Sequence, residues 1–168
     1  ILYHAINAMQ HAAAERVFAV EHDFENQLRQ SHIPLYTLET YTPLCALDML
    51  GFNAACELLY TNILQVIDLG TIPLYARDRG DSYPLIIIGG EAMSNPAPVL
   101  PFADAIFVGD GEEAIELHSV APLQLPLPVG LERDLTCRQE RADGIGDQVE
   151  HQPRAFAAVS QVVEPAQR

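Results

Sequence analysis

Three short segments that contain glycine carry the residues of this sequence best suited to bind a ligand. Each segment lies at the end of an apolar run, where a buried strand would stop. Glycine brings backbone N–H groups to such an edge without a Cβ beside them, so a phosphate or a nucleotide-like tail can approach closely. The candidate binding residues are Gly51, Asn53, Gly89, Gly90, Gly109, Asp110 and Gly111.

Structural roles compete with ligand binding for the same residues. Glycines also make tight strand-to-helix turns that bind nothing. Asp110 and Glu112 are as well placed to cap a following helix as to accept a hydrogen bond from a ligand. Asn95-Pro96 and Pro98 predict a rigid loop on the same edge, which either shapes a pocket or is purely structural. The residues alone leave both roles open.

The sequence contains no recognisable catalytic or metal-binding motif. None of the histidines forms the i, i+4 pair of a helical metal site. Cys45, Cys56 and Cys137 have the spacing of neither a disulfide framework nor a metal motif. A Gly-x-Ser-x-Gly elbow, a Walker loop and a Gly-x-Gly-x-x-Gly fingerprint are also absent. We therefore assign no catalytic residue and no metal ligand.

Alternating strand-like and helical segments must position the glycine segments. Hydrophobic periodicity predicts strands at 16–20, 49–52, 84–88 and 105–108, a short extended segment at 33–38, and helices at 2–13, 23–33, 59–69 and from 112. Asp23 is the expected N-cap of the second helix, and Gly70 the C′ residue of the third. Apolar strands between amphipathic helices predict an α/β fold with a doubly wound parallel sheet. Ligands bind such sheets at the carboxyl ends of the strands.

The region from residue 120 onward shows no persistent helical or alternating period. Pro122, Pro126 and Pro128 open it, and a polar run from Arg133 to Gln152 follows. Such a segment buries too little apolar surface to offset its ordering entropy. We therefore predict an α/β domain over residues 1–119 and an irregular, disordered tail over residues 120–168.

Composition restricts the environment and the partners. A net charge of −14 repels phosphate backbones, which argues against general nucleic-acid binding. No run approaches the ~20 apolar residues that a membrane helix needs. The absence of a signal peptide and the sparse cysteines predict a cytoplasmic protein without a membrane partner.

The order and spacing of several segments resemble a known family. Over residues 1 to about 117 the sequence is similar to the N-terminal cobalamin-binding-like domain of radical S-adenosylmethionine (SAM) proteins of the iron–sulfur oxidoreductase type. The segments that carry the resemblance are 15–19, 33–40, Asp48-Met49-Leu50-Gly51-Phe52, 57–62, 69–74, Ile88-Gly89-Gly90, Asn95-Pro96-Ala97-Pro98 and Val108-Gly109-Asp110-Gly111-Glu112-Glu113.

The resemblance implies a flavodoxin- or Rossmann-like sheet with strand order 2-1-3-4-5, whose first strand lies upstream of Ile1. The strands near Val17 and Leu50 then have no partner between them, and unpaired buried backbone is costly. We expect a truncated domain that is marginally stable or re-pairs. Beyond Ser119 the sequence departs from the family, as after a frameshift or in a diverged linker.

The resemblance also implies cofactors. In the family, a Cys-x-x-x-Cys-x-x-Cys triplet in a following domain holds a [4Fe–4S] cluster, whose open iron takes SAM. This sequence lacks the triplet, so we expect the radical SAM domain as a partner in cis or in trans. Cobalamin would lie along the glycine turns, although the Asp-x-His-x-x-Gly motif of its histidine-ligating form is absent.

Three functions are open at this point. The first is an accessory or binding domain of a radical SAM protein, with no complete catalytic site in this chain. The second is a part of a radical SAM iron–sulfur enzyme whose cluster domain is missing or on another chain. The third is an independent protein-interaction module.

Overall fold

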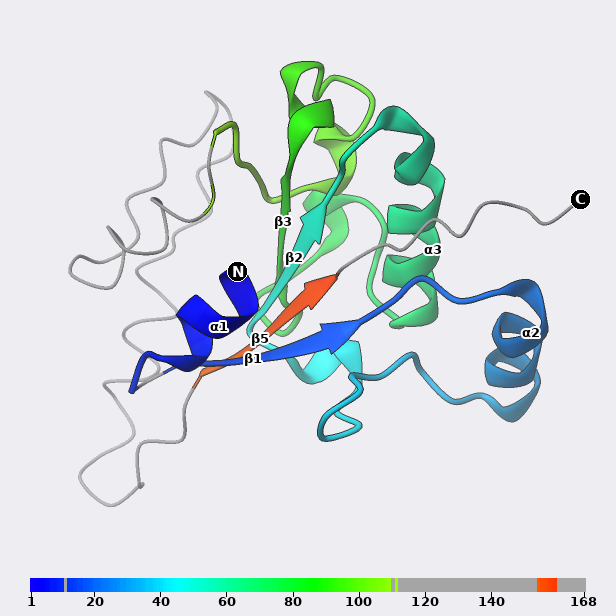
Figure 1. The fold of residues 1–168 in the computed structure, drawn as a ribbon. Coiled ribbons are helices and arrows are strands. Elements are labelled where there is room, and N and C mark those ends of the chain that lie inside the picture. The colour runs from blue at the N-terminus through cyan, green and yellow to red at the C-terminus, as the bar shows by residue number, and fades with distance from the viewer. Residues whose placement is uncertain (11, 110, 112–153, 160–168) are drawn as a thin grey trace, which may run out of the picture.

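The fold is an α/β arrangement built on a five-stranded parallel sheet, as seen in a computed structural model that describes residues 1–10, 12–109, 111 and 154–159 (Figure 1). The strands lie in the order β1-β5-β2-β3-β4. Their bounds are β1 Ala12–Val17, β2 Met49–Asn53, β3 Leu85–Gly89, β4 Ala105–Ile106 and β5 Arg154–Val159. The α-helices are α1 Leu2–Asn7, α2 His22–Ser31 and α3 Tyr60–Leu69. Short 3₁₀ turns are η1 Leu44–Ala46, η2 Glu57–Leu59, η3 Ala76–Asp78, η4 Glu91–Ser94 and η5 Leu100–Phe102.

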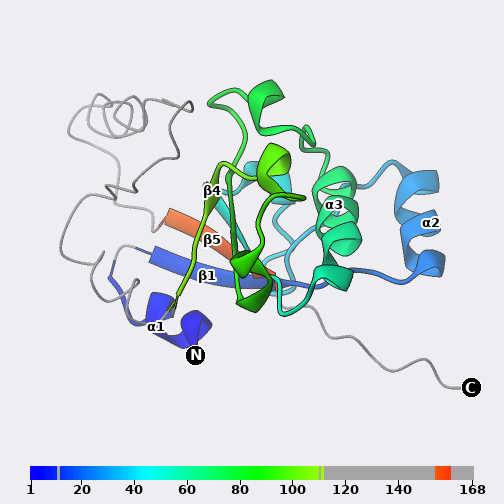
Figure 2. The same cartoon turned by 90° about the horizontal axis from the view of Figure 1, so that it is seen from above.

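The predicted α/β class and parallel sheet are confirmed. The connections β1–β2, β2–β3 and β3–β4 all run in the same direction across the sheet. Right-handed crossovers in one direction place their helices on one face. In agreement, α2 and α3 lie side by side, as two views show (Figure 1 and Figure 2). Most of the connection from β4 to β5 lies outside the described residues.

An interior strand of the sheet comes from the region that we predicted to be an irregular tail. Strand β5 pairs in parallel with β1 along its whole length and with β2 over Met49–Phe52. The prediction was therefore wrong for residues 154–159. Without β5, the backbone groups of β1 and β2 that face each other would be unpaired. The cost of leaving them unpaired explains why the short run 154–159 pairs with both strands. The domain boundary near residue 119, the rest of the predicted tail and the helix expected from 112 lie outside the described residues.

The observed order agrees with the flavodoxin-like order, with β5 in the place of the first strand. Numbered as in that fold, β1, β2, β3 and β4 correspond to strands 2, 3, 4 and 5. The order thus confirms the flavodoxin-like sheet. The expected re-pairing of the gap between the strands near Val17 and Leu50 is what the structure shows.

The first strand begins earlier than predicted. Residues 16–20 were expected, but β1 covers Ala12–Val17, and Val20 instead accepts a hydrogen bond from Gln65 Nε2 on α3 at 3.2 Å. The preceding helix is correspondingly shorter, ending at Asn7. The Asn7 side chain pairs with the backbone of Ala14 through two hydrogen bonds of 2.9 and 3.0 Å. It thereby satisfies polar groups on the outer side of an edge strand.

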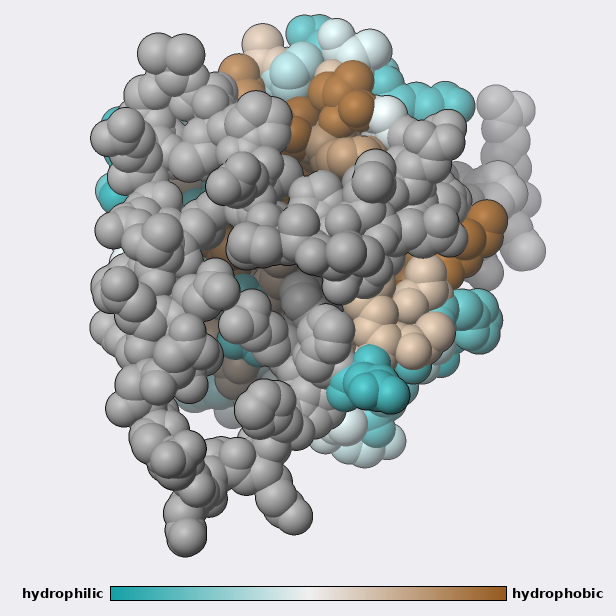
Figure 3. Space-filling view, turned by 90° about the vertical axis from the view of Figure 1, so that its left-hand side faces the viewer, coloured by the Kyte–Doolittle hydropathy of each residue, from teal (hydrophilic) through white to brown (hydrophobic). Residues whose placement is uncertain are grey.

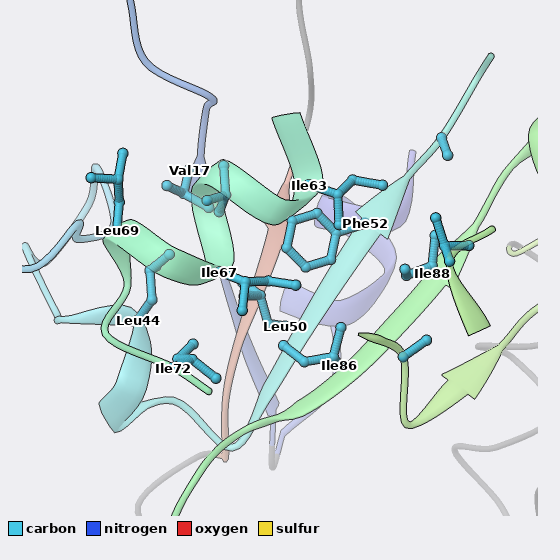
Figure 4. Packing of buried hydrophobic residues seen from close by; sticks show 14 of the residues in the cluster. Val17, Leu44, Leu50, Phe52, Ile63, Ile67, Leu69, Ile72, Ile86 and Ile88 are labelled. Atoms are coloured by element: carbon cyan, nitrogen blue, oxygen red, sulfur yellow. The ribbon is translucent and has the colours of Figure 1, made fainter. Parts of the chain in front are cut away.

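The core lies between the sheet and α3. Leu50 and Phe52 on β2 and Ile86 and Ile88 on β3 point toward the helix, and all four are at most 3% exposed. Figure 4 shows Ile63 and Ile67 of α3 lying over these strand residues, with Val17, Leu44 and Ile72 around them. Burying one such side chain contributes about 1.5–3 kcal/mol. This packing fixes the strand ends against the beginning of α3.

Two predicted helix ends differ in detail. Glu21, not Asp23, occupies the N-cap of α2, and the Asp23 carboxylate accepts a bond from the Phe24 N–H at 2.8 Å. Gly70 is the C-cap of α3 with φ −72°, whereas Thr71 has the positive φ of 57°. Gly70 is nevertheless tightly packed, since a Cβ there would lie 3.1 Å from the Cβ of Leu44. Its role is close approach, not a left-handed turn.

The loop after α2 contains less regular structure than predicted. Of the extended segment predicted at 33–38, only Tyr36 forms a bridge, with Pro43. The stop of α2 before Pro34 is confirmed, with His32 in the left-handed conformation. Within the described ranges, none of the helices has the length and apolar content to cross a bilayer.

Candidate functional site

The site predicted from the glycine segments lies at the carboxyl edge of the sheet, at the top of Figure 1. Because all strands are parallel, Asn53, Gly89 and the residues after Ile106 reach this same edge. In the flavodoxin-like order, ligands bind at the carboxyl ends between strands 1 and 3, whose places are taken here by β5 and β2. Strands β3 and β4 lie further out in the sheet, so the topology does not by itself single out the edge between them. That edge is distinguished by the local surroundings of its residues.

Asn53 and Gly90 form a clamp between the loops that follow β2 and β3. The Ala54 N–H donates to Gly89 O at 2.7 Å, and the Ala92 N–H donates to Ala54 O at 3.0 Å. Gly90 has φ +103°, and a Cβ on it would lie 2.6 Å from both Ala54 O and Asn53 Oδ1. Only glycine fits this conformation and this space. Glycine at position 90 is therefore explained by the tight turn itself, without a bound ligand.

Tyr60 fixes the same loop from the side of α3. Its hydroxyl lies 3.1 Å from Ala92 O and 3.2 Å from Asn95 O, so it bridges both ends of η4. Burial raises the pKa of the Tyr60 hydroxyl, and the carboxylate of Glu57 adds to this shift. The hydroxyl therefore stays protonated as a donor. Sequence analysis missed this residue, because a tyrosine at the start of a helix carries no signal for a loop contact.

Among the described residues, the carboxyl end of β4 is open, whereas that of β2 is tightly packed. Gly109 has φ +128°, and apart from its chain neighbours no described atom lies within 4 Å of the position of a Cβ. Val108 beside it is 70% exposed. Phe107 donates its N–H to Ile88 O at 2.9 Å and lies beside Gly89. Of Gly89, Gly90, Gly109 and Gly111, Gly109 is the one at which the described residues leave open space where a Cβ would lie.

The other predicted site residues do not gather at one point. Gly51 lies in the middle of β2, where it pairs with Ile87 and Ala158, and so does not follow the strand as expected. Gly111 lies against the side chain of Leu2, which would be 3.3 Å from an added Cβ. Asp110 lies outside the described residues. Their ligand binding, like that of the clamp residues, stays a prediction.

Apolar side chains are exposed around this end of the molecule. Leu58, just before α3, is 85% exposed, and Val108 follows β4. Figure 3 shows apolar surface near its top, which is the end toward which β2 and β3 run in Figure 1. A protein partner or the apolar part of a ligand can use such side chains.

A buried ion pair lies at the opposite edge of β3 and β4. Arg79 and Asp104 are 2% and 7% exposed, and Arg79 Nη2 lies 3.1 Å from Asp104 Oδ2. Arg79 also donates to three carbonyl oxygens, those of Pro73, Leu74 and Phe102, at 2.7–2.8 Å. The same carboxylate oxygen accepts from the Ile86 N–H at 2.8 Å. With its donors engaged in this way, the guanidinium ties three loops together and is structural.

The described residues offer no ligand set for an iron–sulfur cluster or another metal. Within the ranges that the structure describes, no group of three or more His, Cys, Asp or Glu side chains comes close enough to hold a metal ion. Cys45 and Cys56 are separate, half-buried thiols. What the carboxyl edge offers instead is backbone groups, one amide side chain and exposed apolar residues, which are suited to binding and orientation.

Comparison with known proteins identifies the family. The sequence matches the family described as radical SAM proteins, N-terminal, over residues 1–123. No curated protein and no solved structure matches the chain. The match covers the α/β region up to and beyond β4, and it ends before β5. On this finding the chain belongs to the radical SAM proteins, and it carries their N-terminal domain.

Proposed function

We propose that this chain is an accessory domain of a radical SAM protein and that it presents the carboxyl edge between β3 and β4 to a ligand or to the radical SAM domain. The cluster and SAM are held in a domain outside this sequence, in cis or on a partner chain. The family match over residues 1–123 supports the first part. It implies an iron–sulfur cluster and SAM in the full protein, for which the described residues offer no ligand set.

One observation carries the choice of edge. Gly109, which follows β4, has φ +128°, and apart from its chain neighbours none of the described residues comes within 4 Å of the position of a Cβ on it. Beside it, the clamp of Asn53 and Gly90 and the hydroxyl of Tyr60 hold the neighbouring loops in place. A rigid edge next to an accessible glycine binds with little ordering cost.

Anaerobic reconstitution with iron and sulfide tests the non-catalytic role. We expect no cluster absorbance after desalting and no cleavage of SAM under reducing conditions. A stoichiometric cluster together with SAM cleavage would overturn the proposal in favour of an enzyme complete in this chain. A reconstituted protein that carries the family's cysteine triplet serves as the positive control.

A corrinoid is the ligand that the resemblance suggests for this edge, and the open Gly109 favours testing it. Hydroxocobalamin that binds would keep its visible bands with the protein through desalting. In that case Gly109→Val should lower the retained absorbance and Gly80→Val should not, because Gly80 has open space but precedes β3. Bands that are fully lost on desalting would assign the edge to a protein partner, as in an interaction module.

A further inference from the structure

One interior strand of this sheet is supplied from far along the chain. Strand β5 lies between β1 and β2, which have no pairing with each other. Residues 112–153 join it to the rest of the described chain. The slot between β1 and β2 is therefore formed by one part of the sequence and filled by another, independently of the proposed function.

Backbone pairing with β1 and β2 accounts for much of the recognition of β5 in this slot. Each residue of β5 has a paired residue on β1, from Ala12↔Arg154 to Val17↔Val159, and Met49–Phe52 pair with it on the other side. The sequence of β5, Arg-Ala-Phe-Ala-Ala-Val, contains alanines where β3 has three consecutive isoleucines. By composition, such a strand gains less from apolar burial than β3 does.

We propose that the slot between β1 and β2 also accepts β5 from a second copy of this chain, which produces a strand-exchanged dimer. Residues 154–159 are the sequence that the structure shows to fit the slot, and every copy carries it. The backbone contacts are identical whether β5 comes from the same copy or from the other. Exchange of an identical element is for this reason a low-cost route to a dimer.

Concentration decides between the closed monomer and the exchanged dimer. The effective concentration of a tethered segment falls with the length of its connection, and it is on the order of 1 mM or less for long connections. Refolding at high protein concentration should therefore populate the dimer, because β5 of a neighbour competes with the chain's own. Dilute refolding should favour the monomer.

Cysteine pairs placed by the observed register test the exchange in the full chain. Ala13 pairs with Ala155, whereas Ala158 lies three residues further along, a distance of roughly 10 Å. The native cysteines are first replaced by alanine. A tagged Ala13→Cys chain and an untagged Ala155→Cys chain are then mixed, unfolded, refolded at high concentration and oxidised. Paired Cα atoms in neighbouring strands lie within the reach of a disulfide.

The expected result is a covalent heterodimer from Ala13→Cys with Ala155→Cys, several-fold more abundant than from the mismatched pair Ala13→Cys with Ala158→Cys. A single chain that carries both Ala13→Cys and Ala155→Cys, refolded dilute, should form an intrachain bond. Equal yields from matched and mismatched pairs would overturn the exchange. Failure of the intrachain bond would overturn it as well, since the strand would then not occupy the slot.

Discussion

At the scale of single residues, Arg79 is the charged side chain on which the packing around β3 and β4 depends most. Its guanidinium is buried and bound to Asp104 and to three carbonyl groups. A buried pair contributes little net stability compared with apolar residues, but removing one partner leaves the other charge buried and uncompensated.

Replacement of Arg79 by leucine should therefore destabilise the domain strongly. We expect Arg79→Leu to lower the free energy of unfolding by about 3–5 kcal/mol, which urea denaturation measures. Arg77→Leu is the matched control, because its side chain is 77% exposed, and it should change stability by no more than about 0.5 kcal/mol. Similar losses for both variants would contradict the structural role of Arg79.

The clamp at the carboxyl edge gives a second prediction for a single residue. Gly90→Ala introduces a Cβ 2.6 Å from two oxygen atoms at a φ of +103°. We expect a loss of at least about 1–3 kcal/mol in thermal or urea unfolding, from backbone strain and displacement of the Asn53 loop. Gly80→Ala, where a Cβ meets no atom within 4 Å, should be close to neutral.

The glycine positions show how far residue types alone predict a site. Gly89 and Gly90 were placed correctly at a strand end, because an apolar run stops there. Their tight contacts with the Asn53 loop were not predictable, since they depend on the register between β2 and β3. Gly51 was misplaced, because an apolar run that contains a glycine does not reveal where the strand ends.

At the scale of elements, α2 is attached to α3 by a network of charged and polar side chains. The Arg29 guanidinium bridges Glu25 and Asp68, at 2.8 and 2.6 Å. Gln65 of α3 donates a hydrogen bond to the Glu25 carboxylate at 2.8 Å, and His22 lies 3.5 Å from the same group. The Gln65 hydrogen bond, followed by that of Arg29, lowers the pKa of Glu25.

This network should make the docking of α2 sensitive to acid. The folded pKa of Glu25 lies below the ordinary value of 4.5, so its contribution is fully present above pH 4.5 and is lost as the pH falls through the folded pKa. We expect the hydrogen-exchange protection factors of α2 amides, which correct for the intrinsic pH dependence of exchange, to fall more than those of α3 amides as the pH is lowered through this range. In Glu25→Gln, the difference in amide protection between α2 and α3 should depend less on pH. If this pH dependence stayed unchanged, Glu25 would not be the group that makes the docking of α2 sensitive to acid.

The elements that the sequence predicted best are the ones with bulky apolar periodicity. Strands β2 and β3 and helix α3 were placed to within a residue or two, since Leu, Ile and Phe alternate or recur at helical spacing. Strand β1 was shifted, because its alanines favour a helix by propensity. Strand β5 was missed, because its run is short and its partners are more than a hundred residues away in the sequence.

At the scale of the whole molecule, the interior strand β5 should control the cooperativity of unfolding. Proline at position 157, whose alanine pairs with Glu15 and Leu50, removes a backbone N–H from an interior strand of the sheet. We expect Ala157→Pro to cost about 3 kcal/mol or more in unfolding free energy and to expose β1 and β2 amides to exchange. Ala166→Pro, beyond the strand, is the control. Equal hydrogen-exchange protection of β1 and β2 amides in both variants would contradict the position of β5 between these strands.

The position of β5 has a consequence for synthesis. The ribosome synthesises the chain from its N-terminus, so β1, β2, β3 and β4 all emerge before β5, the strand that lies between β1 and β2 in their sheet. Pairs such as Ala12↔Arg154 are far apart in sequence, and non-local pairing of this kind slows folding. Until β5 arrives, the nascent domain exposes two strand edges that face each other, which is the form most open to strands of other chains.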